Sequence, residues 1–165
     1  MRGPKLPIAG LFLLLLPAVH AETVPVCVVE SARLGEPALK AFHEEFHRLM
    51  ATSEVRLTRE PCAAQPAIEL TIRQTPPARY RTALGLAFRR GGQVLPQLEL
   101  YVTPVVRLLD GQQTAGIVGR ALARVAAHET LHFLRQQSHH DRDGLMKAVF
   151  RPADLTAASP GVVRD

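Results

Sequence analysis

The sequence predicts an α+β fold, in which one mixed or antiparallel sheet packs against an amphipathic helix and a second, buried helix. Short β-branched runs recur through the first two thirds of the chain, and a long Pro-free run rich in Ala and Leu follows them. An order of strand, helix, several strands and a buried helix is typical of α+β layers. The 165 residues, 47% of them apolar, support one domain with a hydrophobic core.

The first 21 residues are predicted to be a secretory signal peptide rather than part of this domain. Arg2 and Lys5 precede an apolar run of about 12 residues, and Val19-His20-Ala21 offers a cleavage site after Ala21. The run is shorter than the roughly 20 residues of a membrane-spanning helix, and an uncleaved anchor is the alternative. Cleavage leaves residues 22–165 as a single secreted or periplasmic domain, whose net charge falls by two from +5.

Hydrophobic periodicity places the individual elements. Strand-like runs lie at residues 23–30, 54–59, 67–74, 82–89 and 94–103. The turn sequence Arg90-Gly91-Gly92-Gln93 predicts that the last two runs form a hairpin. Apolar residues three and four apart predict an amphipathic helix over 36–50, and an apolar surface on nearly every side predicts a buried helix over 114–137. A short last helix is expected near 151–155.

The two cysteines of the chain, Cys27 and Cys62, are predicted to form a disulfide, as isolated pairs usually do in an oxidising compartment. The loop that it closes would stabilise the fold by about 3–4 kcal/mol in the chain-entropy model. The alternative is a Cys27 thiolate that binds a metal ion. The basic residues are scattered rather than gathered into a patch with aromatic neighbours, so we expect no nucleic-acid partner, and we expect a monomer.

The pattern His-Glu-x-x-His occurs twice, at residues 43–47 and 128–132. Residues four apart lie on the same face of a helix, so the two imidazoles can bind one ion while the Glu faces an attacking water molecule. In the first copy, His43 and His47 lie beside the apolar stripe of an amphipathic helix, next to the charged Glu45. We interpret this copy as a solvated helix face.

The second copy lies within the predicted buried helix, and its neighbours are uncharged. His128, Glu129 and His132 are therefore polar groups in an apolar setting, where each needs a partner. Binding of a metal ion by the two histidines satisfies all three. A catalytic zinc ion has three protein ligands and one open position. No Glu follows Glu129, and the remaining candidates for a third ligand are His139, His140, Asp141, Asp143 and Asp154.

Residues 126–150 read AHETLH, then seven residues to His140, then Gly144-Leu145-Met146. This segment resembles the zincin metallopeptidases, and specifically a metzincin-like group of small exported bacterial proteins with HExxH, a spaced third His and a G-[IL]-M turn. The resemblance implies that His128, His132 and His140 bind Zn²⁺. It also implies that Glu129 is the general base and that Met146 forms an apolar floor in a Met-turn after the site. The Gly that metzincins place after the second His is absent here.

By this resemblance the protein is expected to be an exported zinc endopeptidase, which hydrolyses peptide or protein substrates with metal-activated water and Glu129 as general base. The strand near residues 97–103 is expected to pair with an extended substrate. The alternative is a non-catalytic, zinc-stabilised peptide-binding module or a degenerate peptidase. The histidines form no His-rich tract, which argues against a metal-handling protein.

Overall fold

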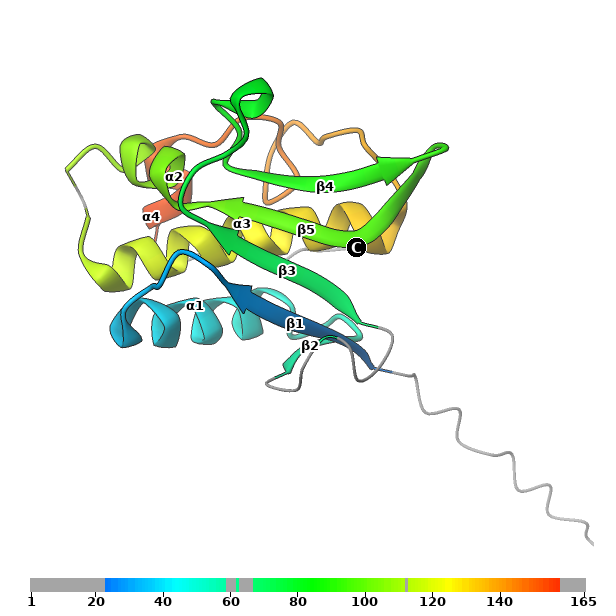
Figure 1. Ribbon diagram of the computed structural model, residues 1–165, viewed down its shortest axis with the longest axis horizontal. Coiled ribbons are helices and arrows are strands. Elements are labelled where there is room, and N and C mark those ends of the chain that lie inside the picture. Colours follow the sequence, from blue (N-terminus) through cyan, green and yellow to red (C-terminus); the bar gives the residue numbers. More distant parts are fainter. Residues whose placement is uncertain (1–22, 59–61, 63–66, 112, 158–165) are drawn as a thin grey trace, which may run out of the picture.

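The computed structural model describes residues 23–58, 62, 67–111 and 113–157, and confirms an α+β fold. A five-stranded mixed sheet has the two long helices, α1 and α3, on one of its faces (Figure 1). The predicted signal peptide, residues 1–21, lies outside the described residues. No helix in the described part of the chain combines the length and the apolar character that crossing a membrane requires.

The sheet has the strand order β2-β1-β3-β5-β4. Its strands are β1 (Val24–Glu30), β2 (Val55–Thr58), β3 (Ile68–Arg73), β4 (Gly85–Arg90) and β5 (Gln93–Tyr101). In this order β2, β1, β3 and β5 are parallel to one another. β4 is antiparallel to β5, with which it forms the predicted hairpin. The turn between them places Gly91 and Gly92 at φ of 58° and 87°, which glycine adopts without steric cost.

This topology overturns the expectation that residues 97–103 bind a substrate strand. β5 is paired along one edge to β3 and along the other to β4, so its backbone there is already hydrogen-bonded. The strand at the edge of the sheet is β4 instead. The end of the expected segment is not a strand either, because a helix begins at Val102.

The two long helices agree closely with the predictions. α1 (Glu36–Leu49) buries Phe42 and Phe46 against the sheet, and α3 (Ala115–Arg135) is buried along most of its length. The helices meet at Gly119, where an added Cβ would lie 2.1 Å from the carbonyl oxygen of Ala38. Two backbones can approach this closely only where one residue has no side chain.

A short helix, α2 (Val102–Leu108), was not predicted. Its three valines favour a strand on local propensity. In the fold, Val105 is fully buried in the core, and Pro104 lies in the first turn, where its missing N–H group costs nothing. Tertiary packing therefore overrides the local preference.

The predicted disulfide is present. Cys27, in β1, is bonded to Cys62, 35 residues later, with the two Cα atoms 5.4 Å apart. The alternative, in which Cys27 binds a metal ion, is therefore wrong. A disulfide is typical of proteins that fold in an oxidising compartment.

A buried ion pair joins α1, α3 and the last helix, α4 (Pro152–Thr156). Arg124 is 1% exposed, and its Nε donates to Glu45 at 2.8 Å. Its remaining N–H groups donate to the carbonyl oxygens of Asp154 and Ala157. Burial opposes the charge on Glu45, but hydrogen bonds from Arg48 and Arg124 lower its pKa below the ordinary value. The sequence did not predict this pair, and Glu45 is not part of a solvated face.

Candidate metal centre

The second His-Glu-x-x-His copy lies in the middle of α3, on its buried part. The helix begins after Thr114, whose hydroxyl accepts from the N–H of Ile117, and continues to Arg135 without interruption. His128, Glu129 and His132 are all buried. Because His128 and His132 lie four residues apart, their rings share one face of the helix, with the ring centroids 4.6 Å apart.

Backbone carbonyl groups orient both imidazoles. Nδ1 of His128 donates to the carbonyl oxygen of Leu145 at 2.8 Å, and Nδ1 of His132 donates to that of Gln137 at 2.8 Å. With Nδ1 protonated, Nε2 of each neutral ring has a free lone pair. These two Nε2 atoms face each other at 3.0 Å. Two lone pairs repel at that distance unless a cation or a proton lies between them.

His140 completes a cluster with the two helical histidines. Its ring centroid lies 5.2 Å from that of His128 and 4.9 Å from that of His132. One ligand nitrogen from each of the three rings lies within 4.8 Å of the others. Zinc–nitrogen bonds of about 2.0–2.1 Å at tetrahedral angles place ligand nitrogens roughly 3.3 Å apart. The three histidines therefore fit a metal ion, and the structure does not specify which one.

A closed loop brings His140 back to the helix. The N–H of Asp141 donates to the carbonyl oxygen of Met146 at 2.8 Å, and between them Gly144 turns the chain at a φ of 77°. Met146 is buried in the core at the end of this loop. The loop thus supplies His140 and, through Leu145, the acceptor for His128.

The other candidate third ligands lie outside the histidine cluster of the described residues. The exposed residues among them are His139, Asp141 and Asp143. Asp154 accepts from the N–H of Arg151 and pairs with Lys147, and this pairing lowers its pKa although burial opposes it. The resemblance selected His140 among these residues, and His140 is the one that the fold brings to the helical pair.

The sharp turn after His132 is made without glycine. Gln136 adopts the left-handed conformation, with φ of 50° and ψ of 38°. Its side-chain amide accepts from the N–H of Val94 at 3.0 Å and donates to the carbonyl oxygen of the same residue at 3.1 Å. These two hydrogen bonds to β5 stabilise a backbone conformation that glycine usually adopts. The missing Gly therefore does not prevent the turn.

Burial sets the protonation of the helical histidines. The pKa of His128 is lowered to about 4, mainly by burial and also by the nearby His132 and His140, although the Leu145 hydrogen bond opposes this. Burial likewise lowers the pKa of His132. Both rings are therefore neutral at pH 7, which is the form that binds metal ions.

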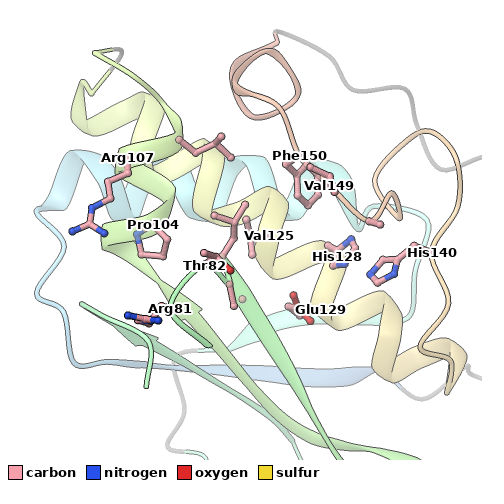
Figure 2. Close-up of a pocket in the computed structure, with 15 residues that line it drawn as sticks. Arg81, Thr82, Pro104, Arg107, Val125, His128, Glu129, His140, Val149 and Phe150 are labelled. Carbon is pink, nitrogen blue, oxygen red and sulfur yellow. The ribbon is translucent and has the colours of Figure 1, made fainter. Parts of the chain in front are cut away.

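The carboxylate of Glu129 reaches β4, and it lies near His128 in the same cavity (Figure 2). Burial raises the pKa of Glu129, and although a hydrogen bond from the Ala87 N–H opposes this, the pKa reaches about 8. Gly85, also in β4, makes room for the carboxylate, since an added Cβ would lie 2.9 Å from its Oε1. We did not identify Gly85 from the sequence, although a glycine inside a strand often marks such a close approach.

Two cavities flank the histidines, and Gly85, His128, Glu129 and His140 line both of them. The smaller, of about 230 Å³, extends along β4 towards Arg89 and Ser138. The larger, of about 730 Å³, extends towards α2 and residues 148–150. The candidate metal centre therefore lies in the middle of an open groove beside the edge strand.

Comparison with known proteins adds no assignment, because no family model matches this chain and no curated protein shows significant similarity to it. The evidence for the site is its own geometry.

Proposed function

We propose that this protein is an exported zinc-dependent endopeptidase, with His128, His132 and His140 as zinc ligands and Glu129 as general base. The observation that carries the proposal is the 3.0 Å approach of two Nε2 lone pairs whose orientation backbone carbonyl groups impose. Three histidines with an open fourth position are typical of hydrolytic zinc sites. Imidazole also suits copper, iron and nickel, so zinc rests on this ligand set and on the resemblance.

Glu129 favours catalysis over a purely structural site. A structural zinc site is usually closed by four protein ligands and has no need of a buried carboxylate beside it. Glu129 instead lies buried in the groove beside the histidines, where a carboxyl group is costly to place and a role as general base accounts for it.

The chemistry divides between the ion and the protein. A zinc ion supplies Lewis acidity, which polarises a peptide carbonyl group and makes water acidic enough to react near neutral pH. The positive charge of a bound ion would favour the carboxylate form of Glu129, whose pKa burial otherwise raises. That carboxylate accepts a proton from the attacking water and donates it to the leaving amine. The Ala87 N–H holds the carboxylate in place between these two steps. The carbonyl groups of Leu145 and Gln137 hold the imidazoles in the tautomer that leaves Nε2 free.

The substrate is proposed to lie as an extended strand along the outer edge of β4. β4 is the last strand in the sheet order, so this edge is not paired to another strand of the described fold. The Ala87 N–H donates to Glu129, and residues 85–87 of β4 line the smaller cavity, which supports this placement. Backbone pairing at a sheet edge binds peptides of varied sequence, as an endopeptidase requires.

Export is proposed from the predicted signal peptide together with the disulfide. Mass spectrometry of the protein recovered from an oxidising compartment checks this, and the expected N-terminus is Glu22.

The test of the function compares Glu129→Gln with Glu44→Gln, the equivalent change in the first His-Glu-x-x-His copy. The zinc-loaded exported protein is incubated with fluorescein-labelled casein. We expect Glu129→Gln to keep its zinc and to lose a factor of about 10²–10⁴ in rate, because it removes a general base, and Glu44→Gln to match the wild type. A zinc-loaded wild type that cleaves neither casein nor a peptide library contradicts the proposal and supports the non-catalytic, zinc-stabilised binding module.

A further inference from the structure

The larger cavity beside the metal centre has two chemically different ends (Figure 2). His128, Glu129 and His140 lie at one end, and Arg81 and Arg107 lie at the other. The wall between them is mainly apolar and is formed by Leu84, Leu108, Val125, Val149 and Phe150. A molecule that filled this cavity would contact the reaction centre, then an apolar wall, then two guanidinium groups.

The positive charge at the far end is not neutralised within the described residues. Arg81 precedes β4 and Arg107 belongs to α2, and neither side chain forms any of the ion pairs found there. Among the described residues that line the cavity, Glu129 is the only acidic one, and it lies at the histidine end. Two arginines from separate elements therefore line one end of the cavity without an acidic partner among the described residues.

Guanidinium groups bind carboxylates with two parallel hydrogen bonds, and apolar surface favours the methylene groups that precede a side-chain carboxylate. We propose that this cavity selects substrates that present a carboxylate to Arg81 and Arg107 while the cleaved bond lies at the histidines. The inference rests on the proposed peptidase function and names its substrate class. The carboxylate belongs to an acidic side chain next to the cleaved bond or to the C-terminus of a short peptide.

The cleavage test uses matched peptides. In the first comparison, quenched fluorescent peptides carry either Glu or Gln on one side of the cleaved bond. In the second, peptides that end just after that bond carry either a free C-terminal acid or an amide. We expect about a tenfold higher kcat/KM for the carboxylate form in one of these pairs, the value of a hydrogen bond to a charged group. A preference for Glu identifies the side chain as the source, and a preference for the free acid identifies the C-terminus.

Arginine variants test the assignment. In Arg81→Ala/Arg107→Ala the preference should fall to about one, with the rate on the neutral peptide changed by less than about threefold, because only the carboxylate contact is lost. Arg56→Ala is the matched control, since Arg56 is exposed on β2, at the opposite edge of the sheet from β4, and does not line the cavity. Equal rates on carboxylate and neutral peptides in the wild type overturn the inference and leave the proposed peptidase intact.

A binding experiment tests the inferred carboxylate preference separately from the proposed peptidase activity. Fluorescent Ala/Gly nonapeptides with one central Glu or Gln, and C-terminal acid and amide forms, are titrated into zinc-loaded Glu129→Gln protein. Binding that is about tenfold tighter for the carboxylate form, and that is lost in the double arginine variant, supports the inference even if the wild type cleaves nothing. Equal binding of the carboxylate and neutral forms overturns it.

Discussion

The two His-Glu-x-x-His copies of this chain lie on helices that pack against each other, yet their environments differ. In α1, His47 is exposed, and Glu44 is 67% exposed in a pair with Lys40. The buried residues of that copy are Glu45 and Phe46, and Glu45 is at the position that Thr130 occupies in α3. In α3, both histidines and the Glu face a strand and a loop.

The difference shows what the pattern needs from the rest of the fold. Helix geometry aligns two imidazoles in either copy, but only α3 meets the carbonyl groups of Leu145 and Gln137 that orient the rings. A third histidine and an edge strand complete the site there. In α1 the motif includes a structural carboxylate, Glu45, that binds Arg124 of the other helix.

The largest expected effect separates the two copies by metal affinity. His128→Ala should weaken zinc binding about a thousandfold, since each of three protein ligands contributes roughly a third of a binding free energy of about 10–16 kcal/mol. His47→Ala should leave it unchanged. Zinc affinity is measured by competition with a chromophoric chelator.

The same measurement on His140→Ala and His139→Ala tests the third ligand. We expect only His140→Ala to weaken binding, and the opposite result would reassign the ligand to His139. If both His128→Ala and His132→Ala bound zinc with wild-type affinity, the proposed metal centre would be wrong.

The next effect concerns stability and the adjacent glutamates of α1. Glu45→Gln should lower the free energy of unfolding by about 3 kcal/mol, because it leaves the buried Arg124 guanidinium without its counter-charge. Glu44→Gln should change it by less than about 0.5 kcal/mol, as exposed substitutions usually do. Urea unfolding of the disulfide-intact protein measures both, and equal values would refute a structural role for Glu45.

The contact between the two helices gives a smaller effect. Gly119→Ala should destabilise by about 2 kcal/mol, because its methyl group would overlap the Ala38 carbonyl oxygen and force the helices apart. Gly116→Ala is the control one turn earlier, where the nearest atom to an added Cβ is the end of Arg120 at 3.7 Å. Because Ala is the better helix former, Gly116→Ala should be neutral or stabilising in thermal unfolding.

The smallest expected effect is on how the free energy of unfolding changes with pH. The folded-state pKa of Glu45 lies below its ordinary 4.5, so its contribution to stability is present above that pH and is lost as pH falls through the folded pKa. The free energy of unfolding should therefore decline more steeply below about pH 4.5 in the wild type than in Glu45→Gln. Urea titrations between pH 6 and about pH 3 compare the two slopes, and identical slopes would contradict the assignment.

The sequence predicted those elements whose structure is set by residues close together in the chain. Periodicity gave α1 and α3, and Gly91-Gly92 gave the hairpin of β4 and β5. The spacing of His128 and His132 was sufficient to place both rings on one face, because helix geometry alone fixes that.

The remaining features depend on residues far apart in the chain. Arg124 and Glu45 are 79 positions apart, and neither residue indicates the other from sequence. The strand order, which makes β4 rather than β5 the edge, is set by long-range pairing. Gln136 in the left-handed conformation escaped prediction because its stabilising contact is in β5.

The contact between Gln136 and Val94 also hinders the association of one molecule with another. β3 pairs with β5 only from Gln97 onwards, so residues 93–96 extend past it with one backbone edge uncovered by β3. Such an overhang is a place where a strand from another molecule can add and begin aggregation. Here the Gln136 amide occupies both backbone groups of Val94, and Pro96 has no N–H group to offer. The residue that turns the chain towards the candidate metal centre therefore also blocks a route to aggregation.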